Sequence, residues 1–348
     1  MDKLIKPIQL NKGDTIGLIS PSSPMAALVP HRTEKGISAL KDLGFDVRIA
    51  TFALDNEGHV SASGEKRAQS INELFADKQI KAIISFIGGN HSSQILKYLD
   101  FDLIKKNPKV ILGFSDFTVL ALAIHAKTNL VTFYGPAVLT QFAENPKPFE
   151  YTLEYFEKAL MTPDKIGKIY PSTTWTDEVL DWFEKKDLER PRKMQDNNGW
   201  QWIKDGEATG PIMGGCITSI MHLRGTEYWP DFSGSILFWE TPESSDDFTS
   251  GENPENIDSY LTDLELSGVF DSISGMIVGR PFGYAEDSEK KLIEIIENRT
   301  RKYTFPILYN VNIGHSDPMI TVPIGVQAWI NSKNNSFEIL ESGVASTS

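Results

Sequence analysis

Hydrophobic and polar positions alternate along the first part of the chain in the manner of strands followed by helices. Segments with apolar residues at helical spacing, such as 34–43 and 65–76, separate short apolar runs rich in β-branched residues. This alternation predicts an α/β fold whose N-terminal unit is a mostly parallel sheet with flanking helices. The expected strands lie at 15–20, 45–50, 81–87, 109–113 and 130–134.

From residue 209 onward the pattern changes to a mixed α/β unit that is richer in strands toward its end. A length of 348 residues also favours two domains over one. We therefore predict an N-terminal domain over 1–160, an interdomain segment over 161–208 and a C-terminal domain over 209–348. The later elements expected are helices near 216–223 and 257–266, strands at 236–240 and 275–279, a charged amphipathic helix at 289–298 and strand-like segments from 319 to 340.

The net charge and composition of the chain argue against several classes of binding partner and indicate where the protein works. A formal net charge of -13 argues against nucleic acid or an anionic membrane surface as the main partner. The first residues lack the apolar core of a signal peptide, and no stretch approaches the roughly 20 apolar residues of a membrane span. The single cysteine, Cys216, excludes an internal disulfide and fits a reducing compartment. A cytoplasmic protein without a metal or cofactor is expected, because no metal-binding or dinucleotide-binding pattern occurs.

A serine at a strand-to-helix turn is the strongest chemical feature of the chain. The apolar run VILGFSD at 110–116 ends a strand at Gly113, and an apolar helical run begins at Phe117. Ser115 between them would project its hydroxyl at the carboxyl edge of the sheet, where nucleophilic serines lie. The stricter Gly-x-Ser-x-Gly pattern is absent, so the same local sequence also fits a serine that caps the helix.

A nucleophilic serine needs a base, and His315 is the best candidate among six histidines. It stands in the turn GHSDP at 314–318, directly after a strand-like run at 307–313. A histidine in such a turn lies at a rim rather than in a core, although a surface-loop histidine fits as well. The other histidines occupy helical or polar surroundings typical of packing or surface residues: His31, His59, His91, His125 and His222.

The base in turn needs an orienting acid, and Glu240 is the best candidate. It ends the apolar run at 236–240, where a carboxylate is costly to bury unless it is paired. The alternative is a strand-end carboxylate that reaches water.

Taken in chain order, these segments resemble the LD-carboxypeptidase family of serine peptidases. The resemblance extends from about the tenth residue to near the carboxyl end. It rests on KGDTIGLISP at 12–21, Gly88-Gly89, GFSD at 113–116, GGC at 214–216, FWE at 238–240 and GHSDP at 314–318.

The resemblance implies a Ser-Glu-His triad in that chain order. Ser115 would be the nucleophile, His315 the base, and Glu240 the residue that orients the histidine. The backbone amides of Gly89 or Asn90 and of Asp116 would then form the oxyanion hole.

The predicted substrate site lies at the carboxyl ends of the parallel strands, where ligands of such sheets bind. Ser20, Gly88 and Phe114 fall there and are expected to contact the substrate. Because Ser115 belongs to the first domain and the acid and base to the second, the active site is expected at the domain interface.

Four of the seven tryptophans lie in the interdomain segment, which a plain Gly/Ser/Pro linker would not show. The indoles either pack the segment onto the protein or form a clamp that stacks on a base or ring. Trp182 is the candidate for stacking. The four residues are Trp175, Trp182, Trp200 and Trp202.

Two branches of the family differ in substrate. One releases terminal D-alanine from murein tetrapeptides, and the other, a microcin C self-immunity branch, cleaves the amide between a peptidyl or aminoacyl group and a modified adenylate. The tryptophan-rich segment and the FWET run at 238–241 resemble the second branch. We therefore expect the second activity, a small peptide or peptidyl-nucleotide substrate, and the homodimer that the family often forms. Murein LD-carboxypeptidase activity and a non-catalytic binding module on the same scaffold are the alternatives.

Two charged features have open roles. The acidic stretch at 243–247 either lines the pocket or lies in solvent. Arg280 pairs either with a substrate carboxylate or, as we favour, with a nearby acid of the protein.

Overall fold

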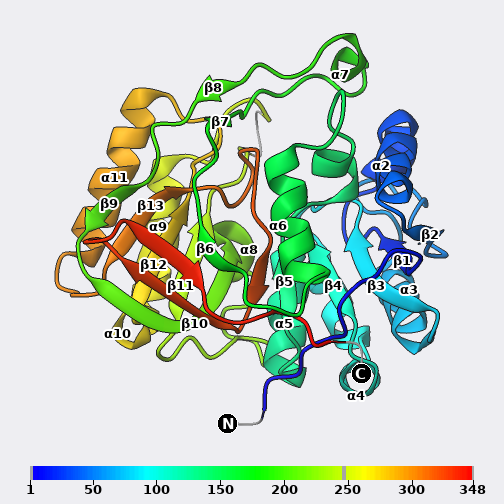
Figure 1. Cartoon of the computed structure of the whole chain (residues 1–348), viewed down its shortest axis with the longest axis horizontal. Helices are drawn as coiled ribbons and strands as arrows, with labels where there is room; N and C mark the ends of the chain where they lie inside the picture. Colours follow the sequence, from blue (N-terminus) through cyan, green and yellow to red (C-terminus); the bar gives the residue numbers. More distant parts are fainter. Residues whose placement is uncertain (1–2, 245–247, 347–348) are drawn as a thin grey trace.

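The computed structural model describes residues 3–244 and 248–346, and these residues form two large sheets side by side, each flanked by helices (Figure 1). The first sheet has the strand order β14-β5-β4-β3-β1-β2. Its strands from the N-terminal region are all parallel, and β14 joins the edge antiparallel to β5. The strands are β1 (Thr15–Ile19), β2 (Asp46–Ile49), β3 (Ile80–Ser85), β4 (Val110–Gly113), β5 (Thr132–Tyr134) and β14 (Val322–Ile324).

The second sheet is mixed and has the order β6-β16-β15-β10-β11-β12-β13-β9. Its centre, from β10 to β13, is parallel, and the strands outside that centre pair antiparallel. The predicted fold class is therefore confirmed. The strands are β6 (Gly167–Ile169), β9 (Gln201–Lys204), β10 (Glu207–Cys216), β11 (Ile236–Glu240), β12 (Gly275–Gly279), β13 (Ile307–Val311), β15 (Gln327–Asn331) and β16 (Ser336–Ile339).

Helices cover the first sheet and the outer side of the second (Figure 1). The longer ones are α2 (Pro30–Asp42), α3 (Gly64–Ala76), α5 (Phe117–Thr128), α6 (Glu150–Leu160), α9 (Pro254–Leu266) and α11 (Glu286–Thr300). The shorter elements are α1 (Met25–Leu28), η1 (Ser92–Tyr98), α4 (Phe101–Lys106), η2 (Val138–Phe142), α7 (Lys186–Glu189), α8 (Ile217–Met221), α10 (Val269–Ser272) and the strand pair β7 (Thr174–Trp175) and β8 (Gln195–Asp196).

Helix α5 lies between the two sheets and follows directly from the Ser115 turn. It contacts β4, β5 and β14 of the first sheet and β10 of the second. All residues from Phe117 to Ile124 are buried. A helix that is apolar on every side must be covered on every side, which explains why the sequence places α5 in the interior.

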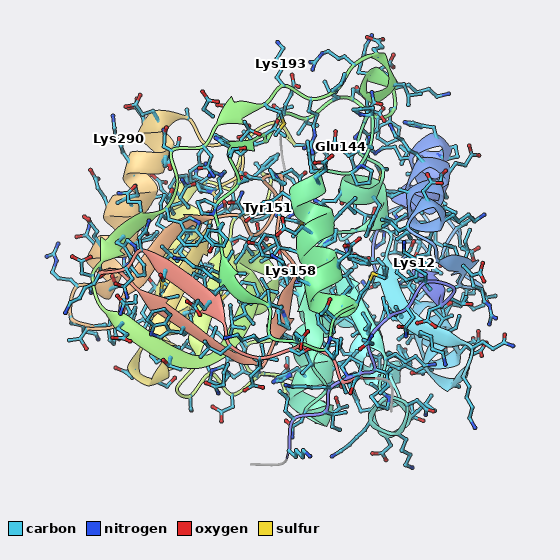
Figure 2. The ribbon with its side chains drawn as sticks, viewed as in Figure 1. Lys12, Glu144, Tyr151, Lys158, Lys193 and Lys290 are labelled. Atoms are coloured by element: carbon cyan, nitrogen blue, oxygen red, sulfur yellow. The ribbon has the colours of Figure 1, made fainter. Side chains whose placement is uncertain are left out.

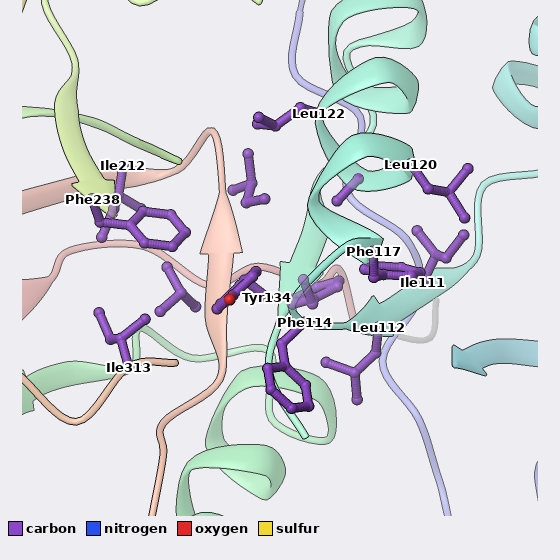
Figure 3. Close-up of a cluster of buried hydrophobic side chains, with 14 of the residues drawn as sticks. Ile111, Leu112, Phe114, Phe117, Leu120, Leu122, Tyr134, Ile212, Phe238 and Ile313 are labelled. Carbon is purple, nitrogen blue, oxygen red and sulfur yellow. The ribbon is translucent and has the colours of Figure 1, made fainter. Parts of the chain in front are cut away.

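The core is continuous between the sheets. Figure 3 shows Tyr134 of β5 between Phe114, at the end of β4, and Phe238 of β11. The Tyr134 and Phe238 ring centroids are 5.5 Å apart, and those of Tyr134 and Phe114 are 6.4 Å apart. The strand ends that carry the predicted chemistry thus rest on one packed cluster.

The carboxyl-terminal strands differ from expectation in one respect. The segment predicted as strand-like from 319 to 340 divides: β15 and β16 belong to the second sheet, whereas β14 crosses back to the first. Pro323 fits this place, because a proline is tolerated on an edge strand that pairs on one side only. The C-terminal region therefore contributes to both sheets.

Candidate active site

Ser115 occupies a strained turn between β4 and α5. Its φ angle is 62°, in the left-handed region that non-glycine residues rarely adopt. The residue before α5 is Asp116, and no side chain caps the helix. The alternative that Ser115 is a helix cap is therefore wrong, because a capping serine has extended backbone and accepts an amide of the first turn. A strained turn of this kind between a strand and a helix is typical of a nucleophile elbow.

The glycine turn after β3 lies directly against Ser115. A Cβ placed on Gly88 would be 2.8 Å from both Cβ and Oγ of Ser115 and 3.0 Å from the Asp116 nitrogen. Gly89 has a φ of 143°, and a Cβ there would lie 2.4 Å from Ser22 Oγ. Only glycine permits this approach, so the sequence pair Gly88-Gly89 brings backbone close to the serine.

Backbone amides around the serine are available for an anion. Among the described residues, the amides of Gly89, Asn90 and Asp116 donate to no protein acceptor. The Asp116 carboxylate is used elsewhere, since its Oδ2 accepts from the amides of His91 and Ser92 at 2.9 Å each. The arrangement can therefore present unpaired N–H donors beside Ser115.

Glu240 ends β11 and is fully buried, and both oxygens of its carboxylate accept hydrogen bonds. Its Oε2 accepts from Nδ1 of His315 at 2.7 Å and from the His315 amide at 3.2 Å. Its Oε1 accepts from the Tyr134 hydroxyl at 2.6 Å. The alternative that this carboxylate reaches water is therefore wrong, and the three donors offset the cost of burying the charge.

His315 lies in a covered position between two carboxylates. Its side chain is 8% exposed, with the Phe114 ring 4.9 Å away, and its Nε2 is 3.2 Å from Oε2 of Glu243. Burial alone would lower the pKa of His315, but the charges of Glu240 and Glu243 outweigh it and raise the pKa to about 9. The raised pKa favours the imidazolium at neutral pH; Nδ1 donates to Glu240, and Nε2 faces Glu243 as an ion pair.

Two functional contacts were missed by sequence reasoning. Tyr134 was expected only as the end of a strand, yet its Oη also accepts the Ser115 amide at 3.2 Å. Its place at the carboxyl end of β5, next to β4, was the available indication. Glu243 was noted only within the acidic stretch at 243–247, whose last three residues lie outside the described residues.

Phe114 and Ser20, both predicted to contact the substrate, have different surroundings in the structure. The Phe114 ring lies 4.9 Å from the His315 ring, and its contact with substrate stays a prediction. Ser20 is buried, and its hydroxyl donates to the Ala53 carbonyl at 2.7 Å. Cys216 is also buried, which raises the pKa of its thiol well above the ordinary value and fits the expected packing role.

The chain matches two family models. Residues 16–135 match the LD-carboxypeptidase N-terminal domain, and residues 209–330 match the LD-carboxypeptidase C-terminal domain. The chain belongs to the LD-carboxypeptidase family. The family and the enzyme class predicted from the sequence, a serine peptidase-type enzyme, are thereby confirmed. The first match contains Gly88, Ser115 and Tyr134, and the second contains Glu240 and His315.

Relatives of this chain carry two kinds of description. The Microcin C7 self-immunity protein MccF of Escherichia coli is 34% identical over 334 residues, which are 94% of each chain. A Bacillus subtilis protein described as a "probable murein peptide carboxypeptidase" is 28% identical over 346 residues, 98% of this chain and 95% of that one. A structure of MccF in complex with aspartyl sulfamoyl adenosine superposes with a TM-score of 0.88 at 32% identity, covering 98% of this chain and 100% of the other.

The tryptophan-rich segment lies between the two matched domains in the sequence and runs along the upper side of the view in Figure 1. One ring face of Trp182 is covered by the Arg32 guanidinium, whose carbon is 4.3 Å from the ring centroid. Arg32 is held by Asp187 of the same segment at 2.7 Å. Trp200 packs near Phe337, and Trp202 donates to Asn335 at 2.9 Å. Trp182 itself is partly buried against the hydrophobic core, so the stacking role expected of it stays a prediction.

The segment also contacts the turn that carries His315. Thr176 and Asp317 exchange backbone hydrogen bonds of 2.7 and 2.8 Å. The Arg192 guanidinium donates to Asp317 Oδ2 at 2.6 Å and also bonds Glu144. Figure 2 shows Glu144 near the upper end of α6, beneath the segment, whereas Lys193 points outward. Burial would lower the pKa of Arg192, but the two carboxylates raise it overall.

Arg280 has a structural pairing, as favoured, but not with an acid. Its Nη2 donates to Asn197 Oδ1 at 2.6 Å, and its guanidinium lies 4.5 Å from the centroid of the Trp175 ring. Among the described residues no carboxylate lies within ion-pair distance of it. Burial lowers the pKa of Arg280 to about 10, so the group remains charged at neutral pH.

Two further properties concern the described residues as a whole. No group of three or more His, Cys, Asp and Glu side chains in 3–244 and 248–346 is arranged to hold a metal ion. Within the same ranges no helix combines the length and apolar character that crossing a membrane requires.

Proposed function

We propose that this member of the LD-carboxypeptidase family is a serine hydrolase with a Ser115-Glu240-His315 triad that cleaves the amide joining a peptidyl or aminoacyl group to a modified adenylate. The observation that carries the proposal is the buried pair of Glu240 and His315, at 2.7 Å, beside the strained turn of Ser115. A carboxylate that orients an imidazole next to a strained serine is what acyl transfer requires.

The chemistry proceeds in two halves. His315 Nε2 removes the proton of Ser115 Oγ while Oγ attacks the carbonyl carbon of the scissile amide. The imidazolium then gives that proton to the leaving nitrogen, and an ester to Ser115 remains. Water, deprotonated by His315, hydrolyses this ester and regenerates the serine.

The surroundings have defined roles in these steps. Amides of Gly89 or Asn90 and of Asp116 stabilise the oxyanion of each tetrahedral intermediate. Glu240 holds the imidazole tautomer and stabilises the imidazolium. Because Glu243 is paired with Nε2 of His315 in the free protein and the nearby charges favour the imidazolium, the reactive state requires this carboxylate to move away and Nε2 to give up its proton to solvent.

The adenylate substrate is supported by the relatives and by the tryptophan-rich segment. MccF, which is similar over nearly the whole chain, has been solved with aspartyl sulfamoyl adenosine. Trp182 is partly buried, and an indole is a surface on which a base stacks but which a D-alanyl peptide would not use. The murein peptide activity is the second candidate, favoured by the name of the Bacillus subtilis relative. A pure binding module needs neither the strained serine nor the buried acid-base pair.

The test is a mass-spectrometric hydrolysis assay with an aminoacyl sulfamoyl adenosine and a murein L,D-tetrapeptide. We expect cleavage of the adenosine compound and its loss, by at least about a thousandfold, in Ser115→Ala. The matched control is Ser23→Ala, which changes a nearby serine outside the triad and should leave turnover within a few fold.

The contrary outcomes are specific. Release of D-alanine alone would replace the proposed substrate by the murein peptide. Turnover that survives in Ser115→Ala would overturn the triad, and absence of turnover on both substrates would favour the binding module.

A further inference from the structure

We propose that Tyr134 is a positioning residue of this active site. Its hydroxyl holds the Glu240 carboxylate and the backbone of the Ser115 turn at a fixed position relative to each other. The inference rests on the proposed triad and assigns to it a fourth member. It starts from one atom, the Tyr134 hydroxyl oxygen, which is bonded both to the acid and to the backbone of the nucleophile.

The ring of Tyr134 has no freedom to move. The residue is fully buried at the end of β5, and the rings of Phe238 and Phe114 pack on it edge-on (Figure 3). A buried aromatic ring held in this way keeps its polar end in one place. The hydroxyl therefore behaves as a fixed point between the first and the second sheet.

The direction of both hydrogen bonds follows from charge. Burial, and then the neighbouring charge of Glu240, raise the pKa of Tyr134 well above its ordinary value, so the hydroxyl keeps its proton. That proton is donated to Oε1 of Glu240, because an ionised carboxylate is an acceptor only. The oxygen lone pairs remain for the Ser115 amide, so the two catalytic segments share a single atom.

Removing the hydroxyl would disturb both partners. No other described residue donates to Oε1 of Glu240, whereas Oε2 receives both bonds from His315. Without Tyr134 Oη, one carboxylate oxygen would be buried without a donor and free to turn away from the imidazole. The same contact occupies the Ser115 amide, which leaves the oxyanion to the amides of Gly89, Asn90 and Asp116.

The experiment compares Tyr134→Phe with Phe238→Leu over a full pH range. Tyr134→Phe deletes one oxygen, whereas Phe238→Leu loosens the packing and keeps the hydrogen-bonded chain. For Tyr134→Phe we expect kcat to fall roughly 10- to 100-fold, with KM within about twofold. We also expect the acid limb of the kcat/KM profile to move to higher pH. Without the hydrogen bond from Tyr134, the Glu240 carboxylate is less stabilised and raises the pKa of His315 further. Phe238→Leu should lower thermal stability without moving that limb.

Substrate-independent labelling separates this inference from the proposed function. A fluorophosphonate that reacts with activated serines should label wild-type Ser115, and the labelling rate should fall in Tyr134→Phe by about the same factor as kcat. If the wild type is labelled but cleaves neither substrate, the proposed substrates are wrong and the labelling rates still test Tyr134.

Several results would overturn the inference. They are a folded Tyr134→Phe protein with unchanged kcat and labelling rate, a loss confined to KM, and a uniform loss at all pH values equal to that of Phe238→Leu. A wild-type protein that is neither labelled nor active would refute the triad, and the role of Tyr134 with it.

Discussion

At the scale of single residues, the charges around His315 determine how the protein responds to pH. Glu240 faces one ring nitrogen and Glu243 the other, and Asp317 adds its charge from the same turn. Each carboxylate favours the imidazolium, and burial opposes it. The pKa of His315 lies at about 9 in the folded chain, above the ordinary value of 6.5. The site therefore binds a proton more tightly when folded than when unfolded.

This proton uptake predicts a loss of stability at alkaline pH. A raised histidine pKa stabilises the folded state fully below about pH 6.5, and the stabilisation disappears as pH rises through about 9. We expect the free energy of unfolding in urea to fall over this range, with a contribution from His315 on the order of a few kcal/mol. In Glu243→Gln the fall should be smaller, because one of the carboxylates is neutral.

The comparison between variants isolates this effect. Lys109 also titrates near this range, since burial lowers its pKa to about 8, but its contribution is the same in both proteins. Glu184→Gln, at an exposed position, is the control and should reproduce the wild-type curve. Identical pH profiles for wild type and Glu243→Gln would show that Glu243 does not stabilise the imidazolium.

At the scale of elements, ion pairs of Arg192 attach the tryptophan-rich segment to the turn that carries His315 and to the residues before α6. Arg192 reaches from the segment to Asp317, two residues after His315, and to Glu144 before α6. Its side chain is 16% exposed and those of its two partners 4 and 5%. When this cation is removed, both carboxylates are left buried without a counter-charge.

Replacement of this cation is therefore expected to be costly. For Arg192→Met we predict a loss of about 3–5 kcal/mol in the free energy of unfolding, measured in urea. We also predict a lower kcat, since the turn that holds His315 loses a support. Lys193→Met changes the adjacent outward-pointing cation and should stay within about 0.5 kcal/mol of wild type. Equal effects of the two substitutions would contradict a structural role for the Arg192 pair.

The same scale shows what the sequence was able to predict. The bounds of β11 and β12 match the expected strands, because a short apolar run is a local property. Glu240 and His315 were found from the run and the turn that carry them. The Tyr134 bond to Glu240 was missed, since the two residues are 106 positions apart and their meeting depends on how the sheets pack. The partners of Arg280 and the return of β14 were missed for the same reason.

At the scale of the whole molecule, the two sheets share one hydrophobic core. The buried cluster includes residues of β4, β5, α5, β10, β11 and β14. Strand β14 also links the two sheets through the chain itself, because it belongs to the first sheet while β13 and β15, its neighbours in sequence, belong to the second. The homodimer expected from the family stays a prediction, which light scattering tests against a chain mass of 38.9 kDa.

A shared core predicts one cooperative unfolding transition rather than two. Every tryptophan lies at residue 175 or later, so tryptophan fluorescence reports mainly on the second sheet and its attached segment, with Trp182 lying against α2 of the first unit through Arg32. Far-ultraviolet circular dichroism reports on both sheets. We expect coincident urea transitions from the two probes. A circular dichroism curve with a second midpoint that fluorescence lacks would show that the first sheet unfolds independently.

The return of β14 has a consequence for how the protein is made. On the ribosome, the first sheet is synthesised long before residues 322–324, and until they arrive the open side of β5 presents unpaired backbone to other chains. The strand that seals this edge follows His315 by only a few residues. A nascent chain thus gains the last side chain of the proposed triad and the strand that covers this edge at nearly the same moment of translation, and a polypeptide truncated before that point would have neither.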